Sequence, residues 1–231
     1  MTEISFQGLS LAFLPTVVVF TIMYFWAADI GTGIYATIRM LVQLLLIGYV
    51  LIFIFETNQP LVIAAVLLVM LLVSSGIAIR PIANKSMRTY YRALIAITLS
   101  SLIVLGLVTQ AVIGVEPWFS PRYVVPLAGM IIAGSMNAVS LAGERMQVEL
   151  SRGEPYIVAR RTAFKASMIP IINSLLAVGL VSLPGMMTGQ ILSGVSPLIA
   201  AKYQIVVMNM LFGAIGMSSA LYLLLSRPSS K

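Results

Sequence analysis

Apolar residues run along this chain in long blocks, and short polar or turn-forming stretches separate the blocks. A helix needs about 20 mostly apolar residues to cross the hydrocarbon core of a bilayer. The pattern predicts a spanning helix in each of seven segments: 9–28, 37–55, 60–79, 93–115, 123–142, 169–193 and 203–225. The predicted fold is therefore an all-α polytopic membrane protein, with residues 1–231 forming a single transmembrane domain.

The second of these segments is the shortest. Its uninterrupted apolar part, from Met40 to Phe55, would rise only about 24 Å at 1.5 Å per residue. Arg39 would then lie at the membrane edge, with its charged end reaching the headgroups. The alternative prediction is six spans plus one helix lying in the membrane interface.

Composition agrees with a membrane protein. The chain is 60% hydrophobic and only 9% charged, whereas about a quarter of the residues of a soluble domain are charged. No polar stretch is long enough to fold as a separate soluble domain. We expect a multi-pass protein of the cytoplasmic (inner) membrane, with the lipid bilayer as its main surroundings.

Basic residues predict the orientation. With seven spans, twelve of the fourteen lysines and arginines fall on one side of the membrane, and only Arg122 and Lys202 fall on the other. Cytoplasmic loops carry the excess of basic residues, so the N-terminus is predicted outside and the C-terminus inside. The net charge of +7 then concentrates on the cytoplasmic face, where anionic lipid explains it better than nucleic acid does.

The chain lacks the residues that several kinds of chemistry require. Cysteine and histidine are absent, and no Gly-Lys pair exists to form a phosphate-binding loop. The seven acidic residues fall in predicted tails, loops or span ends, which counts against proton-coupled or sodium-coupled transport, although backbone carbonyls at a broken helix could still hold sodium. An intramembrane protease is also disfavoured, because Asp29 is the one aspartate. We therefore predict no catalytic residue and no cofactor in this chain.

The longest predicted cytoplasmic connection is the basic, amphiphilic stretch Gly143–Met168. Proline is tolerated in the first turn of a helix, so Pro155 indicates a helix start. This helix could lie on anionic lipid, or it could dock on a cytoplasmic partner. The candidate docking residues are Gly153, Glu154, Pro155, Arg160 and Arg161.

Polar and helix-breaking residues gather in the last three predicted spans. Pro184 removes a backbone donor and disfavours helical geometry at Leu183, so it predicts a break that is either a packed kink or a hinge in a transport pathway. The polar side chains could bond between helices or line that pathway. The candidate pathway residues are Asn137, Ser140, Asn173, Pro184, Gly185, Met186, Met187, Thr188, Gly189 and Gln190.

Three stretches carry a family resemblance. "VGLVSLPGMMTGQILSG", followed by "SPLIAAKYQIVVM", closely resembles the permease subunit of Fet-type ABC transporters, which are implicated in bacterial iron export. Plant relatives of that family form part of an aluminium-tolerance transporter. "RMLVQLLLIGYVL" and "VVPLAGMIIAGSMNAVSLA" are similar to two other recurrent stretches of the family, so the likeness covers nearly the whole chain.

The resemblance implies a permease that is not itself an enzyme. A second copy and two copies of a separate ATPase subunit, which would bind ATP and magnesium, would complete the transporter. Residues 143–168 would form its coupling loop, where "ELSRGEP" is similar to the family's "LSLGATP" at Leu150, Ser151, Gly153 and Pro155 but departs from it at Arg152 and Glu154.

The cargo implied by the resemblance is a metal ion such as iron, or its complex. The predicted spans offer no carboxylate, imidazole or thiolate, and the remaining ligand types bind iron poorly, so a chelated or transiently bound metal fits better. Met186 and Met187 are the candidate soft contacts. An autonomous channel or secondary carrier is the alternative function, and an intramembrane enzyme is a third.

Overall fold

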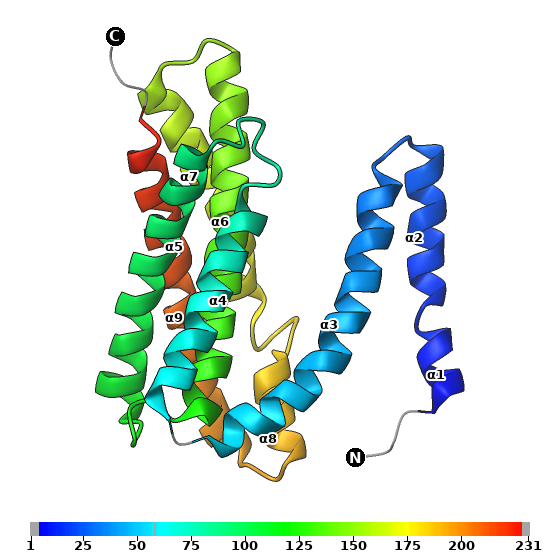
Figure 1. The fold of residues 1–231 in the computed structure, drawn as a ribbon, viewed down its shortest axis with the longest axis vertical. Helices are drawn as coiled ribbons and strands as arrows, with labels where there is room; N and C mark the ends of the chain where they lie inside the picture. Colours follow the sequence, from blue (N-terminus) through cyan, green and yellow to red (C-terminus); the bar gives the residue numbers. More distant parts are fainter. Residues whose placement is uncertain (1–4, 58, 228–231) are drawn as a thin grey trace. The chain divides into compact units, whose positions relative to one another are not determined.

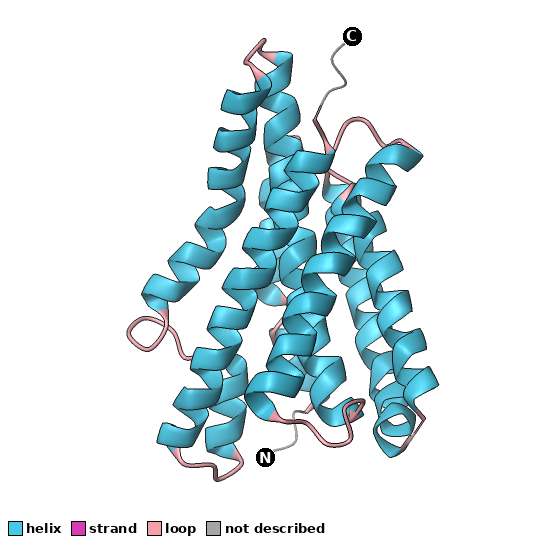
Figure 2. Cartoon of the chain, turned by 90° about the vertical axis from the view of Figure 1, so that its left-hand side faces the viewer, coloured by secondary structure: helices cyan, strands magenta, loops and turns pink. Residues whose placement is uncertain are grey.

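The computed structural model describes residues 5–57 and 59–227. Contacts divide the chain into two compact units, Met1–Glu56 and Thr57–Lys231. Helices joined by turns and loops make up both units, and no strand occurs in the described ranges (Figure 2).

The first unit contains α1 (Phe6–Leu11), α2 (Leu14–Phe25) and α3 (Ile30–Glu56). The side chain of Asp29 stabilises the start of α3, since its Oδ1 accepts the Thr32 N–H at 3.0 Å. Residues of α2 contact residues of α3. Almost every described apolar side chain of these helices is at least partly exposed, and Ile54 is the buried exception. Such surfaces suit lipid rather than water.

The second unit contains α4 (Pro60–Ala78), α5 (Met87–Gly106), the π-helix η1 (Leu107–Ile113), α6 (Pro121–Ser151), α7 (Tyr156–Ala177), α8 (Gly185–Leu192) and α9 (Pro197–Leu225) (Figure 1). Proline occupies the first position of α4, α6 and α9, where a missing N–H costs no helical bond. Serine caps α5, because Ser86 Oγ accepts the Thr89 N–H at 3.2 Å.

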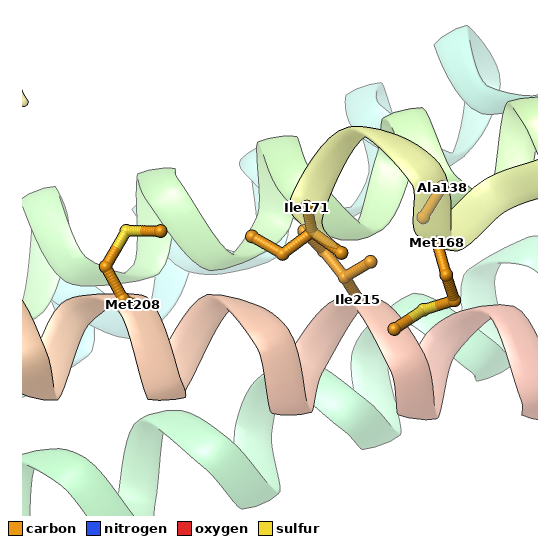
Figure 3. Packing of buried hydrophobic residues seen from close by; sticks show 5 residues of the cluster. All are labelled: Ala138, Met168, Ile171, Met208 and Ile215. Carbon is orange, nitrogen blue, oxygen red and sulfur yellow. The ribbon is translucent and has the colours of Figure 1, made fainter. Parts of the chain in front are cut away.

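Helix α6 packs against α4, α5, α7 and α9. Helices approach α6 closely at its small residues Gly134, Ala138 and Ala142. A Cβ on Gly134 would lie 3.1 Å from Ile215 Cδ1 of α9. Ala138 belongs to a buried cluster with Met168, Ile171, Met208 and Ile215 (Figure 3), and Ala142 packs near Leu223.

Six described helical segments are long and apolar enough to cross a membrane: Gln7–Phe25, Ile30–Glu56, Pro60–Ala78, Met87–Ile113, Pro121–Ser151 and Pro197–Leu225. The short second segment of the sequence prediction belongs to the 27-residue α3, so it needs no interfacial placement. The prediction of one helical span over 169–193 is wrong. The chain leaves the helix at Val178 and starts a new one at Gly185, which is a longer break than Pro184 alone predicts.

The broken segment still runs the length of the second unit. Helix α7 begins beside the end of α6, and α8 lies beside the start of α9 (Figure 1). Arg80, Lys85, Arg88, Arg145, Arg152, Arg160, Arg161 and Arg227 therefore lie toward one end, which we call the basic end, while Arg122 and Lys202 lie near the other. Lys231 falls outside the described residues. That the basic end faces the cytoplasm stays a prediction.

Candidate functional site

The break between α7 and α8 is a compact, hydrogen-bonded loop. Ala177 O accepts the N–H groups of Val181 at 2.8 Å and Ser182 at 3.1 Å, and Gly179 donates to Ser182 O at 3.0 Å. Gly179 has a φ of +84°, a left-handed conformation that a side chain would strain. The loop tip is apolar and open, with Leu180 91% exposed, so water is an unfavourable surrounding for it.

Two cavities of about 310 Å³ each flank the break. We call the first the Pro184 cavity; it is lined by Met130, Ile171, Ser174, Val178, Ser182, Pro184, Gly185, Met186, Gln204, Val207, Met208 and Leu211. The second, the Met187 cavity, is lined by Leu175, Val178, Gly179, Met187, Ala201, Gln204, Ile205, Met208 and Asn209. Val178, Gln204 and Met208 line both cavities and separate them.

Gln204 is the polar residue at this boundary. It is only 6% exposed, and its Oε1 has no hydrogen-bond partner among the described residues. A buried amide oxygen without a partner costs free energy. Sequence reasoning did not select Gln204, although a glutamine near the start of the last apolar block was a visible signal.

The N-terminus of α8 faces the Pro184 cavity, since Pro184, Gly185 and Met186 line it. Within the described ranges, no side chain caps this helix. Its first hydrogen bond is from Thr188 N to Pro184 O at 3.0 Å, and the N–H groups of Gly185, Met186 and Met187 have no acceptor among the described residues. This end of the helix carries a partial positive charge.

The structure brings only some of the predicted pathway residues to these cavities. Pro184, Gly185 and Met186 line one and Met187 the other. The Thr188 hydroxyl donates to Pro184 O at 3.2 Å, and a Cβ on Gly189 would meet open space. Gln190 Oε1 is buried and lacks a partner within the described part of the chain.

The other predicted residues lie elsewhere. Asn137 and Asn173 are exposed and line neither cavity. Ser140 joins two helices, because its hydroxyl donates to Ala78 O of α4 at 2.8 Å. Through this hydrogen bond, Ser140 contributes to helix packing.

The cavities offer few ligands for a bare metal ion. No group of three or more His, Cys, Asp or Glu side chains occurs in the described ranges. The Pro184 cavity is instead lined by Met130, Met186 and Met208, together with residues that carry hydroxyl or amide groups. Of these methionines, sequence reasoning selected only Met186, because Met130 and Met208 come from other helices.

At the basic end, most of the predicted loop 143–168 is helical. Helix α6 continues to Ser151 and α7 begins at Tyr156, which leaves Arg152–Pro155 as the connection. Gly153 has a φ of +85° and makes the turn. Glu149 is 7% exposed, and its Oε1 lies 2.6 Å from Arg145 Nη2 and 3.6 Å from Arg152 Nη1, so the buried carboxylate is paired.

A groove between α7 and α9 opens at the basic end, and we call it the basic-end groove. Its volume is about 380 Å³, and it is lined by Ile157, Arg160, Arg161, Phe164, Ala220, Leu223 and Leu224. The Tyr156 hydroxyl donates to Leu223 O at 2.8 Å, which ties the start of α7 to the end of α9. Gly153, Glu154 and Pro155 are exposed in the adjacent turn.

These features define a multi-pass α-helical membrane protein with a broken helix at one end of the second unit and a basic groove at the other. The chain belongs to the family described as "Uncharacterised protein family (UPF0014)", whose model matches residues 6–160 and 152–229. The resemblance to the Fet-type permeases is confirmed, because the relatives of this chain include a probable iron export permease.

Three relatives illustrate the similarity. The membrane protein slr1647 of Synechocystis is 36% identical over 77% of this chain and 74% of its own length. The protein ALUMINUM SENSITIVE 3 of Arabidopsis thaliana is 34% identical over 86% of this chain and 77% of its own length. The probable iron export permease protein FetB of Escherichia coli is 35% identical over 78% of this chain and 74% of its own length. No solved structure matches the chain significantly.

Proposed function

We propose that this chain is the permease subunit of an ATP-driven ABC transporter that exports a metal ion such as iron, or its complex, across the cytoplasmic membrane. A separate ATPase subunit binds ATP and magnesium, and a second copy of the permease completes the assembly. The named function of FetB supports this proposal, as does the lack of a phosphate-binding loop in the sequence.

The observation that carries the proposal is the path of α7. Its first turns line the basic-end groove, and its last turns line both cavities beside the break. The helix has 22 residues and spans about 33 Å at 1.5 Å per residue. The helix continues through Pro170 and joins the groove to the wall of the cavities as one element, along which a displacement at the groove can pass.

The groove has the chemistry of a protein-docking surface. Ile157 is 70% exposed and Leu224 is 53% exposed, and two guanidinium groups stand beside them. Apolar anchors next to arginine are typical of the central residues of protein interfaces. We assign the groove and the adjacent turn, with Gly153, Glu154 and Pro155, as the surface that contacts the ATPase.

The cargo is best described as a complex rather than a bare ion. The thioether, amide and hydroxyl groups of the cavities are weak ligands for iron. Release is easier from such groups than from a cage of carboxylates. An autonomous channel or carrier is the alternative, and no observation here favours it over the permease.

The docking surface is tested by co-purification of the full chain with the proposed ATPase subunit. Arg160→Ala with Arg161→Ala should weaken association, whereas Lys85→Ala with Arg88→Ala removes the same charge at the basic end outside the groove and should leave it intact. Equal association of both double variants would show that the groove is not the docking surface.

A further inference from the structure

The outward side of α9 carries a polar group that lipid cannot satisfy. Asn209 is exposed, and within the described part of the chain its side chain makes one hydrogen bond, from Nδ2 to Ile205 O of its own helix at 2.9 Å. Its Oδ1 has no donor among the described residues. Acyl chains offer neither donors nor acceptors, so contact with them would leave this amide oxygen unpaired at a cost in free energy.

Asn209 lies in the hydrocarbon region of the bilayer. Helix α9 has 29 residues, so it is about 43 Å long, and Asn209 lies about 18 Å from its start at 1.5 Å per residue. A hydrocarbon core about 30 Å thick includes that depth wherever the core falls along the helix. Polar side chains at this depth face protein or a water-filled space, so we expect a further protein surface to cover Asn209.

A projecting ridge and an open groove lie side by side on this part of α9. Ile205, Asn209 and Phe212 follow one side of the helix at spacings of four and three residues, and Ile205 and Phe212 are 62% and 41% exposed. A groove of about 480 Å³, which we call the α9 groove, lies between this helix and the segment formed by α5 and η1. Ile205 and Asn209 line the groove on the α9 side, and Leu107 and Val112 line it on the η1 side.

Self-complementarity favours a second copy of the chain as the cover. A two-fold symmetric contact uses the same patch on both copies, so the patch must supply each projection together with the groove that receives it. An amide side chain both donates and accepts hydrogen bonds, so Asn209 can pair with its own symmetry mate, as polar side chains do between helices in membranes.

We propose that the outward side of α9 is the contact between two copies of this chain. The two Asn209 side chains pair near the two-fold axis, and the ridge of each copy enters the α9 groove of the other. The proposal rests on the proposed function, which requires a second copy, and it names the surface that this copy covers. Ile205 and Asn209 also line the Met187 cavity, so the second copy adds its own residues to the wall of that cavity.

Cross-linking tests the contact directly, because the chain contains no cysteine and each single-cysteine variant reports one position. Asn209→Cys is treated in proteoliposomes with a short, membrane-permeable bifunctional thiol reagent, without the ATPase subunit or ATP. Leu68→Cys is the matched control, since Leu68 is 56% exposed near the middle of α4. The yield of cross-linked dimer should be severalfold higher for Asn209→Cys, and equal yields would overturn the proposal.

The strength of the dimer tests the pairing of the two amides. Single-molecule photobleaching of the labelled full chain, diluted stepwise in lipid, gives the dissociation constant of the dimer. Asn209→Leu should raise this constant about tenfold, because the hydrogen bonds between the copies are lost. Asn173→Leu, the same change at another exposed asparagine, should leave it unchanged. An unchanged constant in Asn209→Leu would overturn the pairing.

A two-cysteine variant tests whether the first unit covers Asn209 instead. Gln43 is exposed at the middle of α3, so Gln43→Cys is combined with Asn209→Cys in one chain. Cross-linking within the chain, in place of cross-linking between copies, would overturn the proposal. ATP-driven transport is judged by its own assay with the ATPase subunit, so failure of this contact surface and failure of the proposed function are distinguishable.

Discussion

Gly143 lies where α6, α9 and the connection after α4 meet, and its substitution gives a sharp test of the packing at the basic end. An added Cβ would lie 2.4 Å from Ile82 Cδ1 and 3.1 Å from both Ile82 Cγ1 and Tyr222 Cε1. Ile82 is 1% exposed and Tyr222 is 3% exposed, so neither neighbour has open space to move into.

The expected change in the free energy of unfolding of Gly143→Ala follows from two opposing effects. Overpacking of a filled core costs about 1–3 kcal/mol, while alanine is favoured over glycine in a helix by about 1 kcal/mol. Gly143→Ala should therefore lower the free energy of unfolding by up to about 2 kcal/mol. Gly213→Ala is the control, because a Cβ there meets nothing within 4 Å, and it should be neutral or stabilising by up to about 1 kcal/mol.

Unfolding of both variants in detergent, measured by fluorescence or by thermal aggregation, checks this expectation. Ile82→Val deletes the atom that the new Cβ would meet at 2.4 Å, so the double variant should be more stable than the sum of the two single effects predicts. A double-mutant cycle measures that coupling. Stabilisation of Gly143→Ala equal to that of Gly213→Ala, or additivity with Ile82→Val, would refute the close approach of these residues.

Three further predictions follow from the two ends of the second unit. Tyr156→Phe removes the hydrogen bond to Leu223 O, so the ATPase rate should persist while the cargo moved per ATP falls, and an unchanged ratio would contradict transmission through α7. Gly179→Ala forces a side chain into a φ of +84°, which costs about 1 kcal/mol or more, and transport assays should show impairment beyond any loss of expression. Met186→Leu with Met187→Leu conserves volume, so transport should be nearly normal, and a large loss would show that the thioethers touch the cargo.

Apolar block length predicted the class of fold well because the bilayer sets a minimum length for each span. It placed α4 to within one residue at each end, since Pro60 marks its start, and it placed the end of α9 but began that helix at 203 instead of Pro197. It began α3 and α7 too late, because residues such as Gly31, Thr32 and Arg160 occur in helical turns outside a purely apolar window. Composition alone does not distinguish a helical turn at the membrane edge from a loop.

The sequence predicted only part of the candidate site. Pro184 and Gly185 predicted a break, but the early end of α7 at Ala177 depends on Gly179 and on the hydrogen bonds that Ala177 O accepts. Gln204 joins the site from another helix, and the basic-end groove combines α7 with residues of α9 more than fifty positions later. Such neighbours follow from tertiary packing, which one sequence does not specify position by position.

The central claim is that a separate ATPase drives transport through this chain. The most direct measurement is flux of radiolabelled iron, supplied as its citrate complex, in proteoliposomes that contain the chain alone or the chain with its ATPase subunit. The account predicts flux only with the ATPase subunit, ATP and magnesium together, and loss of flux when the ATPase cannot hydrolyse ATP. Equal flux through the chain alone, without ATP, would contradict the account and establish a channel or carrier.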